Sequence, residues 1–377
     1  MERNNLKYMP LKVADIFCGA GGLSYGFSHN NFFDMVWAND IDKDALDSYA
    51  LNHRNVKVMH SDIIDIDRDK LLGYGKIDIL LGGPPCQSYS TLGKRKMDKR
   101  AHLFEEYIRV LRILKPKMFI FENVVGILSM QKHTLFTKIC EEFQTLGYKI
   151  YYKILNAAHF GVPQIRERVF VVGICKKICL QDFIFPSATH KHSSDLTNLL
   201  NFTTLQDAIG DLPIIKSGEN GDKKGYLFEP NNDFLRFVRK SRILQEHSSP
   251  KNNPNLVKIM QTLKDGQCKD DLPQNIRPKS GYTNTYAKMW WLQPAPTITR
   301  NFSTPSSSRC IHPRDSRALS IREGARLQSF PDDYKFIGRD NSKKLQIGNA
   351  VPPLLSIAIA KAVQEYFYKI FKEIDNV

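Results

Sequence analysis

Apolar and polar positions alternate over the first 175 residues in a pattern that predicts strands and helices in turn. Short apolar runs predict strands at Leu11–Phe17, Met35–Asn39, Ile77–Leu81, Met118–Phe121 and Arg168–Ile174. Helices are predicted at Leu23–His29, at Lys43–His53, and where Leu103, Tyr107, Leu111 and Leu114 recur at helical spacing before Lys115-Pro116. Such alternation predicts an α/β fold with a parallel, doubly wound sheet.

The pattern breaks down after about Cys175. Residues 185–300 are rich in Asn, Ser, Pro and Lys, which predicts a second, smaller and irregular domain. Regular structure returns near Arg317–Gln328, and a final apolar helix is expected at Leu354–Phe371. We therefore expect a first domain at 1–180, an irregular domain at 181–315 and a C-terminal segment, 316–377, that returns to the first domain.

The chain is basic, with 54 Lys and Arg against 39 Asp and Glu and a formal net charge of +15. This charge favours a polyanionic partner such as nucleic acid, although a generally basic enzyme would look the same. The N-terminus is polar and no apolar run is long enough to span a bilayer, so we expect a cytoplasmic protein without a membrane partner.

The seven cysteines are scattered, and Cys175 and Cys179 form the one close pair. No second pair completes a zinc set, so we expect no metal site and mostly reduced thiols, one of them a candidate for catalysis.

Polar or Gly-rich clusters follow the ends of the predicted strands. They are Asp15–Gly22, Asp40, Asp62, Gly82–Cys86 and Glu122. Ligands of open parallel sheets bind beyond the carboxyl ends of the strands, so these clusters predict one site.

The first cluster is a glycine-rich turn that would let the backbone approach a nucleotide. Ser24 stands where the dinucleotide fingerprint requires its third glycine, which argues against NAD and favours an adenosine cofactor without phosphates. Asp40 would accept from ribose hydroxyls, and Asp62 from the adenine amino group. Each acid taken alone is typical of a solvated or capping residue.

Cys86 follows two prolines that fix the φ angles before it. It lacks the apolar flanks of an inert buried cysteine, and the Lys and Arg residues that follow favour a thiolate. Glu122 follows four apolar residues, so desolvation is expected to raise its pKa, unless it forms a structural ion pair with a Lys. Arg166 and Arg168, two apart on a predicted strand, would share one face, although an edge strand with alternating charges would look the same.

Together these segments resemble the DNA (cytosine-5)-methyltransferases of the bacterial, restriction-modification type. The resemblance covers most of the chain and rests on Asp15–Leu23, Ala38–Asp40, Ser61–Ile63, Gly83–Ser88, Phe121–Val124, Gln164–Arg168, Arg317–Pro331 and Gly348–Pro352. It implies S-adenosylmethionine as cofactor, held by Phe17, Gly19, Ala20, Gly21, Gly22, Leu23, Asp40, Ile41, Asp62, Ile63, Pro84, Asn349 and Ala350.

The resemblance also implies the catalytic roles. Cys86 would be the nucleophile on a flipped cytosine, Glu122 the partner of N3, Arg168 the contact to O2, and Arg166 a support of the same pocket. Asp40 stands where the family more often has Glu, so a shorter side chain would have to reach the ribose. Ile165 stands where a basic residue is common and should face away from the arginines.

Residues 181–315 would be the target recognition domain for double-stranded DNA. Five of the eight residues at 93–100 are basic. They are expected to form a mobile loop that contacts phosphates through Lys94, Arg95, Lys96, Lys99 and Arg100, although an ordinary solvated loop could carry the same charges. We expect a monomer, with a restriction endonuclease as a possible companion.

Three further functions stay open on the sequence alone. An RNA cytosine-5 methyltransferase would have the same fold, and a DNA-binding protein that has lost catalysis would have the same net positive charge. A NAD-dependent oxidoreductase would have a similar glycine-rich turn, but it needs the glycine that Ser24 replaces. The sequence predicts neither the recognised DNA word nor the base that removes the carbon 5 proton.

Overall fold

The computed structural model describes residues 9–85, 103–130, 134–279, 281 and 284–375. Cys86 and the basic residues between Lys94 and Arg100 therefore lie outside the described residues. The chain forms two compact units: unit 1 is 1–155, 167–187 and 355–377, and unit 2 is 156–166 and 188–354. Residues 316–354 thus belong to unit 2, and residues 355–377 to unit 1.

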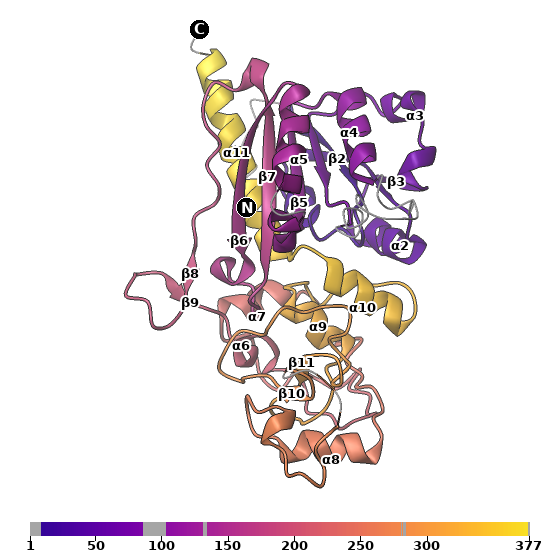
Figure 1. Cartoon of the computed structure of the whole chain (residues 1–377), viewed down its shortest axis with the longest axis vertical. Helices are drawn as coiled ribbons and strands as arrows, with labels where there is room; N and C mark the ends of the chain where they lie inside the picture. Colours follow the sequence, from indigo (N-terminus) through magenta and orange to yellow (C-terminus); the bar gives the residue numbers. More distant parts are fainter. Residues whose placement is uncertain (1–8, 86–102, 131–133, 280, 282–283, 376–377) are drawn as a thin grey trace. The chain divides into compact units, whose positions relative to one another are not determined.

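Unit 1 is built on a seven-stranded sheet in the order β3-β2-β1-β4-β5-β7-β6 (Figure 1). The strands are β1 Leu11–Ile16, β2 Phe33–Asp40, β3 Lys57–His60, β4 Ile79–Gly82, β5 Met118–Val124, β6 Tyr148–Asn156 and β7 Glu167–Cys175. Strands β1 to β5 pair in parallel, which confirms the predicted fold class, but β7 is antiparallel to β5. The sheet thus departs from the predicted parallel arrangement at β7, which follows β6 after the short segment 157–166, whereas a strand parallel to β6 would require a longer crossover.

Helices cover both faces of this sheet. They are α1 Tyr25–Ser28, α2 Lys43–Asn52, α3 Arg68–Leu72, α4 Leu103–Leu114, α5 Thr134–Thr145 and α11 Pro353–Asp375, with 3-10 turns η1 Ile63–Asp65, η4 Val125–Leu128 and η7 Lys176–Ile178. On one face, Tyr107 of α4 and Phe143 of α5 pack on Phe119 and Phe121 of β5. None of the helices in the described part of the chain has the length and apolarity needed to cross a membrane.

The long helix α11 closes the other face of the sheet. The hydroxyl oxygen of Ser356 accepts a 2.8 Å hydrogen bond from the backbone N–H of Gly26 in α1. A Cβ on Gly26 would lie 2.4 Å from the Ser356 carbonyl oxygen, so the two helices touch backbone to backbone. The last segment of unit 1 is therefore joined directly to its first helix.

Unit 2 is irregular, as residues 185–300 predict. Its elements are η6 Ala157–Phe160, β8 His190–Lys191, β9 Leu200–Asn201, α6 Leu205–Ile209, α7 Asp233–Val238, α8 Pro254–Thr262, η8 Lys269–Asp271, β10 Ala287–Lys288, β11 Arg309–Ile311, α9 Ile321–Leu327 and α10 Asp340–Asn349. Helix α9 begins with a capping box, in which Ser320 and Glu323 bond to each other's backbone N–H groups.

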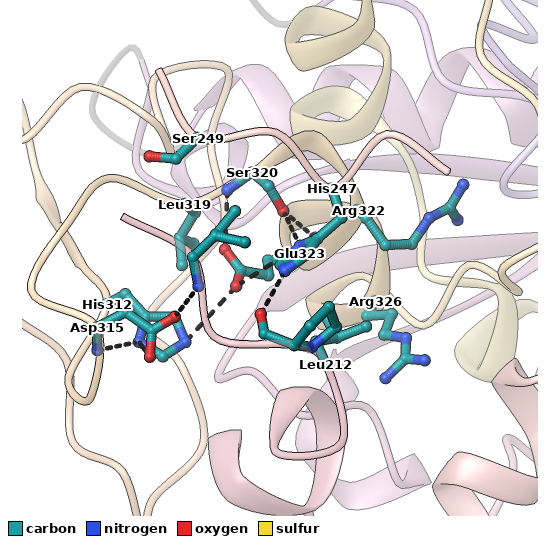
Figure 2. Close-up of polar contacts among 12 residues, drawn as sticks. Leu212, His247, Ser249, His312, Asp315, Leu319, Ser320, Arg322, Glu323 and Arg326 are labelled. Carbon is teal, nitrogen blue, oxygen red and sulfur yellow. Dashed lines mark hydrogen bonds and ion pairs between the residues drawn. The ribbon is translucent and has the colours of Figure 1, made fainter. Parts of the chain in front are cut away.

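Buried ion pairs join distant segments of unit 2. Both oxygens of Glu323 accept from Arg317, at 2.7 and 2.8 Å. His247 bonds to the Ser320 hydroxyl at 3.0 Å (Figure 2). Burial opposes ionisation of Glu323, but the Arg317 guanidinium holds the pKa of this carboxyl well below its usual range. Arg326 is likewise buried and donates to Asp211 and Asp332.

Candidate active site

The glycine-rich turn after β1 is fixed by a carboxylate from β2. Asp40 accepts hydrogen bonds from the N–H of Gly19 at 2.7 Å and of Asp42 at 2.8 Å. Gly21, at φ +89°, has no room for a side chain, since a Cβ would lie 2.1 Å from Nε2 of His53. At Gly19, by contrast, no described atom lies within 4 Å of the Cβ position, so the turn is open on that side.

The buried carboxyl of Asp15 supports the same turn through Ser24. The hydroxyl of Ser24 donates to Asp15 at 2.6 Å and accepts from the Tyr49 hydroxyl at 2.9 Å. Burial, with a further contribution from Asp40, raises the pKa of Asp15 to about 7. Burial also raises the pKa of Asp40. Ser24 thus has a structural role in a hydrogen-bonded chain, where the dinucleotide fingerprint would have glycine.

Acidic residues lie at the ends of β2 and β3: Asp40 is the last residue of β2, and Asp62 follows β3. The amide of Asn39 donates to the Met59 and Ser61 carbonyls at 2.9 Å, which ties the ends of the two strands together. Asp62 accepts from the Ile64 N–H at 3.2 Å and so caps η1, the role that is typical of such an acid taken alone. Ile41 is 65% exposed, which leaves an apolar surface beside these acids.

The ends of β4 and β5 bring Glu122 next to the turn that leads to Cys86. A Cβ on Gly83 would lie 3.0 Å from Oε2 of Glu122. The amide of Asn123 donates to the Pro84 carbonyl at 3.1 Å. Nε of Arg168 on β7 lies 3.1 Å from Oε1 of Glu122, and both side chains are only 14% exposed. Glu122 is therefore paired with Arg168, and not with a Lys as in the structural alternative.

Arg166 differs from Arg168 in its surroundings. Strand β7 begins at Glu167, so Arg166 lies just before it, and the prediction that the two arginines share one face of a strand was wrong. Arg166 is buried in unit 2 and donates to the Ile298 and Gly348 carbonyls, both at 2.9 Å. Asn349 ends α10 and Ala350 follows as its C-cap.

Sequence reasoning missed two supporting residues, Asn123 and Tyr49. Asn123 stands inside a segment that the resemblance used, but its partner, Pro84, lies 39 positions away. Tyr49 sits in a predicted helix whose pattern carries no signal for the Ser24 contact.

A family comparison identifies the chain. Residues 11–365 match the family model described as C-5 cytosine-specific DNA methylase. The chain belongs to this family. The enzyme therefore methylates cytosine in DNA, as a DNA (cytosine-5)-methyltransferase. This excludes the oxidoreductase, and it argues against both the RNA methyltransferase and the DNA-binding protein without catalysis.

The relatives of the enzyme agree with this assignment. The Type II methyltransferase M.DdeI of Desulfomicrobium norvegicum is 36% identical, over 96% of this chain and 90% of that protein. Type II methyltransferase M1.HphI of Haemophilus parahaemolyticus is 33% identical, over 94% and 87%. The S. pombe Dnmt2 methyltransferase structure shares the fold, with a TM-score of 0.59 at 17% identity over 94% of this chain and 99% of that one.

Proposed function

We propose that the enzyme transfers a methyl group from S-adenosylmethionine to carbon 5 of a cytosine flipped out of a specific double-stranded DNA sequence, through a covalent bond between Cys86 and carbon 6. The observation that carries this proposal is the Arg168–Glu122 pair, held against Gly83 at the start of the turn that leads to Cys86. A carboxyl and a guanidinium at this position suit the N3 and O2 edge of one pyrimidine.

The residues after β1, β2 and β3 fit the proposed cofactor, which supplies an electrophilic methyl group on a sulfonium. Burial raises the pKa of Asp15 and of Asp40, and a nearby cation such as the sulfonium would stabilise the ionised form of these carboxyls. The open side of Gly19 would admit the cofactor, and the exposed Ile41 offers an apolar surface to adenine. Phe17, Ala20, Gly22, Leu23, Asp62, Ile63, Pro84, Asn349 and Ala350 complete the proposed set.

The residues of the chain then carry the reaction. The thiolate of Cys86 forms a bond to carbon 6, and the ring electrons move toward N3, where Glu122 supplies a proton. Carbon 5 becomes enamine-like and accepts the methyl group. Loss of the carbon 5 proton then breaks the sulfur–carbon bond and restores the ring. The cytosine must leave the base stack first, at a cost of about a few kcal/mol.

Residues 181–315 are proposed to recognise the target, and Lys94, Arg95, Lys96, Lys99 and Arg100 to bind phosphates. A monomeric state and a companion restriction endonuclease are further parts of the proposal. Because its substrate is DNA, we place the enzyme in the cytoplasm.

A duplex that carries 5-fluorocytosine at the target tests the covalent step. Fluorine replaces the proton whose loss releases the enzyme, so the protein should stay attached to DNA through denaturing electrophoresis, and only with S-adenosylmethionine present. Cys86→Ser should abolish the adduct, while Cys140→Ala should leave it. Peptide mapping that found the nucleotide on another residue would refute the mechanism.

A further inference from the structure

One exposed arginine stands alone in a long stretch of unit 2. Between Trp291 and Ser308, Arg300 is the one charged residue, and most of its neighbours carry hydroxyl or amide groups. Thr299, Arg300 and Asn301 are exposed, while Ile298 and Phe302 on either side are buried. We call Thr299–Asn301 the Arg300 corner.

The backbone before the corner is held by hydrogen bonds although it has no regular structure. The N–H of Ile298 donates to the Gln164 side chain at 2.9 Å, and the Thr297 hydroxyl donates to the Ile165 carbonyl at 2.8 Å. Arg166 adds a 2.9 Å bond to the Ile298 carbonyl. Three consecutive residues of one segment thus fix the two residues that precede the corner.

Close packing fixes the corner itself. A Cβ on Gly348 would lie 2.3 Å from the Arg300 nitrogen and 2.5 Å from the Thr299 carbonyl carbon, so α10 touches the corner backbone directly. The ring of Phe302 packs on Gly324 of α9 in the same manner, since a Cβ on Gly324 would lie 2.3 Å from the ring carbons. The corner therefore has little freedom to move relative to the rest of unit 2.

Burying a guanidinium costs free energy unless its hydrogen bonds are made. The buried Arg166 donates two hydrogen bonds next to the Arg300 corner, to the backbone carbonyls of Ile298 and Gly348. The result is a fixed backbone that presents a side chain to solvent. Among the described residues, the Arg300 guanidinium has no hydrogen-bond or ion-pair partner. A rigid backbone that carries an arginine without a partner among the described residues is expected of a recognition element, because little conformational entropy is lost when a ligand binds.

We propose that the Arg300 corner contacts the DNA substrate, with Arg300 binding it through its guanidinium fork. This inference rests on the proposed function and adds a residue to it. The surrounding chain favours an anion, since residues 251–310 contain nine Lys or Arg against three Asp or Glu. Arginine, threonine and asparagine are side chains that bond to phosphates and to base edges.

The fork matches a pair of acceptors on DNA, either two phosphate oxygens or O6 and N7 of a guanine. Lysine distinguishes the two, because it preserves the charge that a phosphate requires but loses the bidentate geometry that a guanine requires. Arg300→Lys should therefore restore binding in the first case only.

The test uses the full-length enzyme and a duplex with its target sequence, identified by bisulfite sequencing of DNA from cells that express it. Arg300→Ala should bind this duplex about 10-fold more weakly than the native enzyme, as expected for loss of one good contact. Arg242→Ala is the matched control, since it removes the same charge from another exposed site of unit 2. It should bind within about 2-fold of native.

The readouts separate the outcomes. If Arg300→Lys restores affinity and the salt slope lost by Arg300→Ala, the contact is a phosphate; if it does not, and methylation relaxes at one base position, the contact is a guanine. Arg300→Ala with native affinity, slope and specificity would overturn the proposal, and so would equal weakening by Arg242→Ala. Thermal melting confirms that all three variants fold. If the native enzyme methylated no cytosine, the proposed function would fail instead.

Discussion

The side-chain amide of Asn123 donates a hydrogen bond to the carbonyl oxygen of Pro84. Its own carbonyl oxygen accepts from the Val124 N–H at 2.9 Å, which fixes the amide end toward Pro84. The strand residue next to Glu122 thus holds the carbonyl of Pro84, which stands two positions before Cys86 in the sequence.

We predict that Asn123→Ala slows methyl transfer by roughly 10-fold, because a buried hydrogen bond worth about 1–3 kcal/mol is lost and the carbonyl partner is left unpaired. Cofactor affinity should fall less than the rate, since Pro84 is one proposed cofactor residue and most of the others follow β1, β2 and β3. Single-turnover kinetics and calorimetry measure the two effects. A native rate in Asn123→Ala would show that Pro84 is held by other contacts.

Glu122→Gln should slow formation of the 5-fluorocytosine adduct by about 10²-fold or more, the usual contribution of a positioned acid. The amide has no acidic proton for N3, and the ion pair with Arg168 is lost. Glu106→Gln, which removes an ion pair with Arg109 on α4, is the control and should leave the rate unchanged. Equal adduct rates in Glu122→Gln and Glu106→Gln would show that Glu122 does not act in the reaction.

Asp15→Asn should stabilise the enzyme increasingly as the pH rises. The unfolded carboxyl titrates near 3.8 and the folded one near 7, so the folded state holds the extra proton between these values. Native stability is therefore lost from about pH 4 to pH 7, by a few kcal/mol, and asparagine cannot ionise. Urea unfolding at pH 4, 6 and 8 measures the difference. A difference that did not vary with pH would contradict the assignment; Asp34→Asn, at an exposed site on β2, is the control.

Asp211→Ala should destabilise unit 2 by about 3–5 kcal/mol, because it leaves the buried Arg326 with one carboxylate, Asp332. Asp233→Ala breaks an exposed pair with Arg236 and should cost less than about 1 kcal/mol. Thermal melting compares the two variants. Similar melting temperatures would mean that the buried pair adds little to stability.

A hybrid enzyme tests where the target is recognised. Exchange of residues 187–300 for those of a related enzyme should change the methylated sequence, provided that Asp211 and His247 are kept. These two residues bond to Arg326 and Ser320, which lie beyond the exchanged segment. Bisulfite sequencing reads the new target. An unchanged target in a folded, active hybrid would place recognition elsewhere.

The central strands were predictable because they are buried on both faces and therefore read as apolar runs. The two edge strands were not: β3 has one buried residue of four, and β6 has two buried residues of nine. Glu122 and Asp40 were predictable as polar residues after such runs. The carbonyl partners of Arg166 and the Asp211 partner of Arg326 were not, because they lie more than 100 positions away and no local pattern encodes them.

The contact between Gly26 and Ser356 spans 330 positions of the chain. During synthesis, α1 leaves the ribosome long before its partner helix exists, and at about 5–20 residues per second the interval is roughly 20–60 s. All of unit 2 is made in that interval. We therefore expect the sheet of unit 1 to stay incompletely covered until translation is nearly finished. A chain whose synthesis stops within unit 2 would lack α11, and we expect it to be inactive in methylation.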